Sequence, residues 1–331
     1  MKKGKRMAVI AGMATAVLAN CVVGVYASEE EMSEALNFEE GYKVGLAVTT
    51  VEYPFYVSMV EGFEKSCQAF GIEYVVSDAG MDAAKQVSDC EDMMSQGVDA
   101  LIISTWYPDA MSGVIQDMAD AGIPVILLDA SDPPEVDYLT NIGSDNYESG
   151  YLAGLWTGSY IADKDGKEEI NYIELVQPSA EGRNRADGFN EGLEDSGLTV
   201  NLLNSCDASS REVSMANAED ALVAFDNIDL MFGACAQGSL GANDACTAAQ
   251  RTEIKIVGYD CEVEEQEYID QGENYIASVK QYPALMVEEA LNTLDAYLGG
   301  AEVEKRIPFD NGLYTCEGEL TFDEIRENYG G

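Results

Sequence analysis

Short apolar runs alternate with amphipathic stretches along the first half of the chain, from Tyr42 onward. The apolar runs are rich in valine and isoleucine, as buried parallel strands require, and they fall at 44–48, 74–77, 100–104 and 125–129. Helical periodicity lies between and after them, at 56–70, 82–96 and 109–121. A glycine follows each helical stretch, and glycine best tolerates a left-handed helix end. This order predicts a doubly wound α/β sheet.

The same alternation restarts after Gly143 and continues to a final helical stretch at 284–298. Apolar runs lie at 170–176, 200–203, 230–234, 254–259 and 276–279, and helical stretches at 147–161, 184–196, 212–225, 239–250 and 262–271. Two α/β halves in tandem predict two Rossmann-like, parallel-sheet lobes with a ligand in the cleft between them. Ligands of such sheets bind beyond the carboxyl ends of the strands, so functional residues should directly follow strands.

Three crossovers, near Asp145, Gln281 and Asp310, are expected to join the lobes and to act as hinges. The N-terminal lobe then comprises residues 42–145 plus 281–310. The C-terminal lobe comprises residues 146–280 plus 311–331.

The first 41 residues lack this alternation. A basic stretch precedes an apolar run at 7–25 and a small-x-small site ending at Ala27, which predicts a secretory signal peptide over 1–27. Cys21 follows Leu-Ala-Asn, so lipidation there is the alternative, although asparagine is a poor residue before a lipidated cysteine. Residues 28–41 are acidic and predict a flexible tether. We expect export to the periplasm or to the outer face of the cytoplasmic membrane.

Composition narrows the classes of function. With 61 acidic against 18 basic residues the formal net charge is −43, which excludes nucleic acid as a partner and disfavours anionic membranes. The chain contains no histidine, so Ser-His-Asp and Cys-His catalysis and histidine-containing zinc sites are excluded. Seven cysteines follow the expected cleavage site without any Cys-x-x-Cys pair, and an odd number leaves at least one thiol unpaired. No cofactor is indicated.

Candidate site residues follow the strands of the first half. Thr49 comes after the first strand, and Phe55 and Tyr56 lie in the next loop, where they either stack on a sugar ring or cap helix packing. Trp106 follows the third strand and is a stacking platform or a core residue. Asp129 ends the fourth strand, where ligand hydroxyls can supply hydrogen-bond donors to its carboxylate; an N-cap or lobe contact is the alternative.

The second half offers matching candidates. Arg183 and Arg185 lie near a helix start, where cations oppose the helix dipole, so either ligand oxygens or a salt bridge explains them. Asp260 ends a strand and mirrors Asp129, and Gln281 follows the last strand near a crossover.

Five motifs occur in order along the chain: Pro54-Phe-Tyr56, Gly-Ile-Pro-Val-Ile-Leu-Leu-Asp129, Ile-Gly-Ser-Asp-Asn146 with Gly150, Arg185-x-x-Gly-Phe189 and Val-Gly-Tyr-Asp260. With them, residues 42–315 resemble the ribose/galactose class of periplasmic sugar-binding proteins. In that family a pair of phenylalanines sandwiches the sugar, while Asp, Arg and Gln bind its hydroxyls. The matching positions are Phe55, Tyr56, Asp129, Arg185, Asp260 and Gln281.

The resemblance implies the substrate-binding component of an ABC transporter. Its lobes close around a small carbohydrate or sugar-like ligand, and the closed monomer docks on a membrane permease. Tyr53, Ala130 and Cys235 depart from the family's polar residues at the cleft, and no second stacking aromatic is evident near Asp207. These losses argue against ribose itself, and Trp106 instead fits a pocket for a larger or less hydroxylated solute.

Other interpretations remain open at this level. An exported sugar or autoinducer sensor for chemotaxis or a kinase has the same fold and site. A glycosidase could use Asp129 and Asp260 as its carboxylate pair. Asp163 and Asp165 resemble part of a calcium loop, although a surface turn is the better interpretation. A sugar-responsive repressor has this fold too, but the signal peptide and the charge exclude it.

Overall fold

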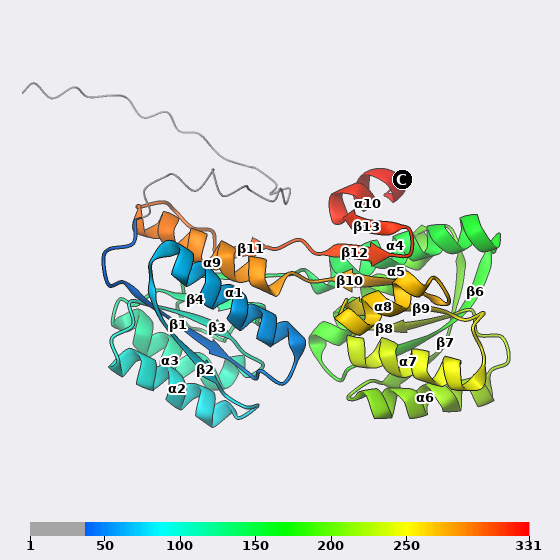
Figure 1. The fold of residues 1–331 in the computed structure, drawn as a ribbon, viewed down its shortest axis with the longest axis horizontal. Coiled ribbons are helices and arrows are strands. Elements are labelled where there is room, and N and C mark those ends of the chain that lie inside the picture. Colours follow the sequence, from blue (N-terminus) through cyan, green and yellow to red (C-terminus); the bar gives the residue numbers. More distant parts are fainter. Residues whose placement is uncertain (1–36, 331) are drawn as a thin grey trace, which may run out of the picture. The chain divides into compact units, whose positions relative to one another are not determined.

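The computed structural model describes residues 37–330 of the chain (Figure 1). The expected signal peptide, Cys21 and residues 28–36 of the expected tether lie outside the described residues. In the part of the chain that is described, no helix combines the length and the apolar character needed to cross a membrane.

Strands and helices alternate along the chain. The strands are β1 Lys43–Val48, β2 Glu73–Asp78, β3 Ala100–Ser104, β4 Val125–Leu128, β5 Thr140–Gly143, β6 Glu169–Val176, β7 Thr199–Asp207, β8 Leu230–Gly233, β9 Lys255–Asp260, β10 Tyr275–Lys280, β11 Arg306–Pro308, β12 Gly312–Thr315 and β13 Gly318–Thr321. The helices are α1 Pro54–Phe70, α2 Ala83–Ser95, α3 Pro108–Asp120, α4 Asn146–Asp165, α5 Ala180–Asp195, α6 Arg211–Ala224, α7 Ala236–Ala249, α8 Val263–Gln271, α9 Pro283–Leu298 and α10 Phe322–Tyr329.

These strands form two sheets, which we call the N-terminal and C-terminal sheets. The N-terminal sheet has the order β11-β5-β4-β3-β1-β2, and the C-terminal sheet has the order β13-β12-β10-β9-β8-β6-β7. The chain crosses between the sheets three times: from β5 to β6, from β10 to β11 and from β11 to β12. The doubly wound α/β class is therefore confirmed.

One edge of the C-terminal sheet departs from the expected parallel arrangement. β12 pairs antiparallel with β10, and β13 pairs antiparallel with β12. The connection between β12 and β13 is too short for a helical crossover, and antiparallel pairing is the arrangement that such a short connection allows.

Helices cover both faces of the N-terminal sheet. α1 and α9 lie on one face and α2 and α3 on the other (Figure 1). Alternate residues of the same strand point to opposite faces: Leu46 of β1 packs under α1 and α9, while Ala47 packs under α2 and α3. Helix α9 follows β10 of the other sheet, yet its residue Met286 joins the core of the N-terminal sheet.

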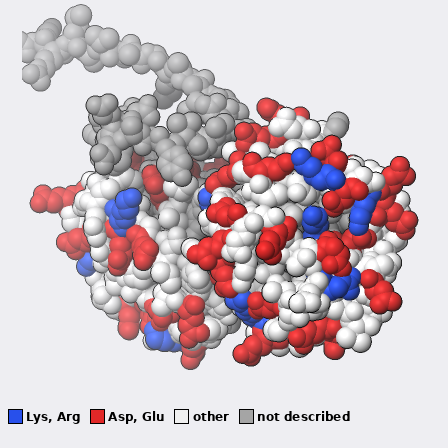
Figure 2. All heavy atoms as spheres, turned by 45° about the vertical axis from the view of Figure 1, so that its right-hand side comes forward, with Lys and Arg blue, Asp and Glu red and all other residues white. Residues whose placement is uncertain are grey.

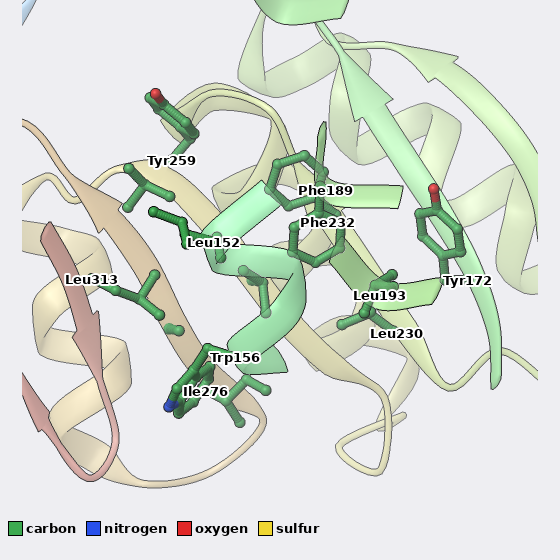
Figure 3. Packing of buried hydrophobic residues seen from close by; sticks show 14 of the residues in the cluster. Leu152, Trp156, Tyr172, Phe189, Leu193, Leu230, Phe232, Tyr259, Ile276 and Leu313 are labelled. Atoms are coloured by element: carbon green, nitrogen blue, oxygen red, sulfur yellow. The ribbon is translucent and has the colours of Figure 1, made fainter. Parts of the chain in front are cut away.

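The C-terminal sheet is built in the same way. Helices α4, α5 and α10 cover one face, where Phe189 and Phe232 stack with ring centroids 3.9 Å apart and planes within 4° (Figure 3). Trp156 and Tyr172 are fully buried in the same cluster. Helices α6, α7 and α8 cover the other face, around residues such as Met231.

Helices α4 and α5 approach each other through glycines. A Cβ atom built on Gly150 would lie 2.1 Å from the backbone oxygen of Arg185, and one built on Gly188 would lie 2.0 Å from that of Tyr147. Gly154 and Gly192 make equally close approaches one turn further along. Because no side chain larger than hydrogen fits there, these glycines allow the start of α4 to lie directly against the part of α5 that carries Arg185.

The end of the expected tether is packed against the folded body. The backbone N–H of Asn37 donates to Asp295 Oδ1 over 2.6 Å, and the ring of Phe38 stacks near Phe70 with centroids 6.1 Å apart. The expectation of a flexible segment therefore fails for residues 37–41. The prediction rested on the acidic residues of this segment and did not take into account Phe38, whose ring packs near Phe70.

Acidic side chains cover the surface. Figure 2 shows a face on which carboxylates outnumber the basic side chains. All seven cysteines of the described residues are free thiols, and five of them are buried. Helix α4 runs through Asp163 and Asp165 and ends at Gly166 in the left-handed conformation, so these two aspartates lie in a helix rather than in a calcium loop.

Candidate ligand-binding site

Three of the expected site residues form one polar group at the carboxyl ends of β9 and β10. Arg185 Nη1 lies 3.5 Å from Asp260 Oδ1, and Gln281 Nε2 donates to the same oxygen over 2.8 Å. The backbone N–H of Ala236, which is the first amide of α7, donates to Asp260 Oδ2 over 3.1 Å. Asp260 is therefore held by three donors. Its carboxylate orders the other two side chains.

Gln281 leaves one atom unused. Its side chain is buried, and the acceptor Oε1 has no hydrogen-bond partner among the described residues. Buried polar atoms are nearly always paired, and an unpaired one costs about 1–3 kcal/mol. This oxygen can therefore accept a hydrogen bond from a group that residues 37–330 do not supply.

Arg185 is buried and positioned from several sides. Its Nε donates to Asn146 Oδ1 over 2.7 Å, its Nη1 donates to the backbone oxygen of Ala234 over 3.1 Å, and its guanidinium carbon lies 3.8 Å from the ring centroid of Tyr259. Burial alone would lower the pKa of Arg185, but Tyr259, Asp260 and Asp129 together raise it. The guanidinium is therefore a fixed cation. The neighbouring Arg183 instead pairs with Glu174, which was the salt-bridge alternative.

Asp129 follows β4 of the N-terminal sheet. Its backbone has φ 46°, and Asp260 has φ 88°, so both strand-end aspartates adopt the left-handed conformation. Such backbone strain concentrates at functional sites. Within residues 37–330 no lysine or arginine forms an ion pair with Asp129. Burial raises the pKa of Asp129, Asp260 and Glu181 raise it further, and Arg185 opposes them.

Thr49 and Trp106 link two loops at the same end of the N-terminal sheet. Thr49 Oγ1 donates to the backbone oxygen of Ser104 over 3.3 Å and accepts from the backbone N–H of Trp106 over 3.1 Å. The hydroxyl of Thr49 is therefore occupied, and its role is to fix the loop that carries Trp106. The Trp106 side chain is 49% exposed, which rules out the core alternative.

The two adjacent aromatics have different environments. Tyr56 is buried on α1 in the core of the N-terminal sheet. This agrees with the interpretation in which it caps helix packing. Its ring makes edge contacts with Phe55 and Trp106, at 5.2 and 6.0 Å between centroids. Burial, followed by the charge of Asp129, raises the pKa of the Tyr56 hydroxyl. Phe55 is half-buried.

Cys235 lies at the start of α7. Its thiol is buried and donates weakly to the backbone oxygen of Ala208 over 3.8 Å. Burial raises the pKa of Cys235 to about 12, so the side chain is a neutral thiol. It belongs to the hydrophobic cluster on the α6–α8 face of the C-terminal sheet.

Candidates that follow strands of the N-terminal sheet and candidates of the C-terminal sheet influence one another electrostatically. The charges of Arg185 and Asp260 act on Asp129, although they belong to opposite sheets. Ser131 Oγ donates to Glu181 Oε1 of α5 over 2.9 Å, which links the segment after β4 to the C-terminal lobe. The expectation that strand ends of both sheets supply one group of residues is consistent with these contacts.

A separate hollow of about 730 Å³ lies on the C-terminal lobe, lined by Tyr147, Glu174, Arg183, Asp187, Asn190, Glu191, Glu194, Asp195, Val200 and Leu202. Of the candidates from the sequence it contains only Arg183, whose guanidinium is paired with Glu174. Its carboxylates are largely engaged by neighbours, as in the ion pairs of Arg183 with Glu174 and Asp187. The strand-end residues, with the unpaired Gln281 Oε1, are therefore the better candidate site.

Three residues beside the candidates were not singled out by the sequence. Asn146 accepts from Arg185, and Tyr259 lies under the guanidinium. Asn311 donates to the Tyr259 hydroxyl over 3.4 Å. Asn146 and Tyr259 do occur within the family motifs, and Asn311 adjoins the expected crossover at Asp310. The sequence therefore indicated that these residues lie near the site, but it did not indicate which residues they contact.

Comparison with known proteins now identifies the family. The model of the periplasmic binding protein domain matches residues 44–302. This chain belongs to the periplasmic binding protein family. It is 31% identical over 268 residues to the ribose import binding protein RbsB of Bacillus subtilis, covering 80% of this chain and 85% of that protein.

Solved structures share the fold. A periplasmic solute-binding protein of an ABC transporter from Actinobacillus succinogenes, with bound D-allose, has a TM-score of 0.73 at 23% identity and covers 83% of this chain and 98% of its own. A periplasmic ribose ABC transporter protein from Conexibacter woesei has a TM-score of 0.75 at 21% identity, with 88% and 96% covered. The predicted membership of the periplasmic sugar-binding family and the predicted two-lobe α/β fold are thereby confirmed. These relatives are binding proteins of transporters, so the glycosidase alternative is not supported.

Proposed function

We propose that this protein captures a small sugar or sugar-like molecule outside the cytoplasm and delivers it to an ABC importer. The observation that carries the proposal is the buried, unpartnered Oε1 of Gln281 beside the Arg185–Asp260 pair. A ligand hydroxyl supplies the missing donor at Gln281 and accepts from the guanidinium. Sugars present many such groups on a small frame. Relatives named for ribose import and a neighbour with bound D-allose support this class of ligand.

Each candidate has a role in the proposed site. Arg185, Gln281 and Asp129 bind ligand hydroxyls, and Asp260 holds Arg185 and Gln281 in place. Trp106 and Phe55 stack on the apolar face of the ring. Thr49 and Tyr56 position this aromatic group, and Cys235 contributes a neutral thiol. Cys235 and Ala130 stand where the family has polar residues, which favours a ligand with fewer hydroxyls than ribose has.

Binding proceeds by closure of the two lobes. The N-terminal lobe comprises residues 42–145 plus 281–310, and the C-terminal lobe comprises residues 146–280 plus 311–331. The three chain crossings support this division, because each leads from one sheet to the other. Ligand held by one lobe recruits the other and becomes buried.

The remaining steps follow from this role. A signal peptide over residues 1–27 directs export, with cleavage near Ala27 or, as the alternative, lipidation at Cys21. The closed monomer docks on the permease of the importer. No reaction is carried out on the ligand.

Isothermal titration with D-ribose and D-allose tests the proposal. Binding should be saturable and should weaken at least tenfold in Gln281→Met, which keeps the side-chain length but removes Oε1 and the donor to Asp260. Gln116→Met is the control, since Gln116 is paired with Asp120 on the far helix α3. Equal affinities in all three proteins would show that the ligand lies elsewhere.

A further inference from the structure

Arg185 is joined to all three chain crossings by hydrogen bonds. The first crossing begins with the segment Ser144–Ser149, and its residue Asn146 accepts from Arg185 Nε over 2.7 Å. The second begins at Gln281, which reaches Arg185 through the shared oxygen Asp260 Oδ1. The third contains Asn311, which reaches Arg185 through the Tyr259 hydroxyl and Asn146 Oδ1. A single buried cation therefore connects three segments that are far apart in the sequence.

Asn311 uses both its side-chain oxygen and its side-chain nitrogen in hydrogen bonds of this network. It is 3% exposed. Its Oδ1 accepts from Ser144 Oγ over 2.9 Å, and its Nδ2 donates to Ser149 Oγ over 3.1 Å and to the Tyr259 hydroxyl over 3.4 Å. An amide nitrogen has two hydrogens, and both are used. The third crossing is therefore bonded to the first crossing and to the end of β9 at the same time.

Tyr259 carries this connection to the guanidinium. Its hydroxyl accepts from Asn311 and lies 3.5 Å from Asn146 Oδ1, the same oxygen that binds Arg185. The Arg185 guanidinium carbon lies over the Tyr259 ring, 3.8 Å from the ring centroid. Fixing the hydroxyl fixes the ring, and the ring together with Asn146 fixes the plane of the cation.

We propose that Asn311 is a positioning residue for ligand binding, which acts through Tyr259 and Asn146 to orient Arg185. The inference rests on the proposed function, in which Arg185 binds the ligand. Bidentate recognition by arginine depends on the orientation of its plane, so loss of Asn311 weakens binding without removing any atom from the site.

The first test is a double-mutant cycle on affinity, with D-ribose and D-allose as probes. Asn311→Ala should weaken binding about tenfold, and Tyr259→Phe, which deletes one oxygen and keeps the ring, should do nearly the same. Because both changes break one connection, the double variant should lose little more than either alone. Asn274→Ala is the control, since Asn274 is also a buried asparagine of this lobe but contacts neither residue. Full affinity in Asn311→Ala, or fully additive losses, would overturn the inference.

The second test needs no ligand. In the empty protein the Arg185 Nε–H resonance, identified by its loss in Arg185→Lys, should be distinct, because that hydrogen is bonded to Asn146 and the ring of Tyr259 lies beside it. Asn311→Ala and Tyr259→Phe should move or broaden it, and Asn274→Ala should leave it in place. An unchanged resonance in Asn311→Ala would overturn the inference whatever the affinities are. A displaced resonance without any sugar binding would support the positioning role and contradict the proposed ligand class.

Discussion

Substitution of Gly188 by alanine places a methyl group between α4 and α5. The new Cβ atom would lie 2.0 Å from the backbone oxygen of Tyr147 and 2.9 Å from the backbone nitrogen of Tyr151. Both neighbours are backbone atoms of a helix, so neither can turn away as a side chain can. The two helices have to separate.

The size of the effect follows from this distance. Ordinary contacts of a Cβ atom begin near 3.4 Å, so the backbones must move apart by roughly 1.4 Å. Overpacking of a well-packed interior typically costs about 1–3 kcal/mol. We expect the upper end, about 3 kcal/mol, because the contacts of Gly150, Gly154 and Gly192 are opened by the same movement. Asn146 and Arg185 lie on these two helices, so their 2.7 Å hydrogen bond is also stretched.

Thermal unfolding of the empty protein measures this cost. With an unfolding entropy of about 2.1 cal/mol/K per residue and roughly 300 folded residues, about 3 kcal/mol corresponds to a fall in Tm of roughly 5 °C. Gly113→Ala is the matched control, since Gly113 lies within helix α3 with no atom within 4 Å of the new Cβ. Alanine there should raise stability by up to about 1 kcal/mol. A Tm of Gly188→Ala within one or two degrees of the unaltered protein would refute the close-packing argument.

Three further changes test individual parts of the account. Asp129→Asn should weaken sugar binding about 10–100-fold in calorimetric titrations while leaving the Tm of the empty protein equal or higher, because burial disfavours the charge of Asp129; unchanged affinity would contradict its role. Trp106→Ala should lower affinity but change the free energy of unfolding by less than about 0.5 kcal/mol, since half of the side chain is exposed; a large fall in Tm would show that it is a core residue. Burial raises the pKa of Glu265 to about 8 from 4.5, so the folded state retains a proton that the unfolded state loses. The contribution of Glu265 to stability should therefore decline as the pH rises from about 5 to 8, by at least ~1 kcal/mol, and Glu265→Gln should flatten the decline in melting curves taken across that range; an equal slope in both proteins would contradict the assignment.

The regular α/β body was predictable because each element carries a strong local pattern. The helix expected at 109–121 is observed at Pro108–Asp120, and the strand expected at 100–104 has those same bounds. Runs of valine and isoleucine and the glycines after helices depend only on neighbouring residues. Such signals do not require knowledge of the tertiary structure.

The short elements were missed because their patterns are weak. β5 has only four residues, Thr-Asn-Ile-Gly, with one large apolar side chain, yet it is fully buried in the sheet. β12 and β13 have four residues each and pair antiparallel. The first turn of α5, which begins at Ala180, is polar and precedes the helix expected at 184–196. For the three short strands, tertiary pairing rather than local propensity decides the structure, whereas the start of α5 is fixed locally by the Ser179 N-cap.

The candidate site was predictable in its residues but not in its connections. Strand ends pointed to Asp129, Asp260 and Gln281, since topology alone places each of them at the carboxyl end of a strand in its own sheet. No sequence pattern shows that Thr49 uses its hydroxyl within the protein, or that Tyr56 is buried while Phe55 is not. Asn311 lies 162 residues from Ser149 along the chain, and only the folded chain makes them partners.

The most direct test of the central claim is a thermal-shift screen of purified residues 28–331 against pentoses, hexoses, polyols, disaccharides, nucleosides and furanosyl compounds. A ligand at a hundred times its Kd adds about 2.7 kcal/mol to stability, which corresponds to a shift of several degrees. The account predicts such a shift for at least one sugar and its loss in Arg185→Ala. No shift with any member of the panel, or an equal shift in Arg185→Ala, would contradict a sugar site at these residues.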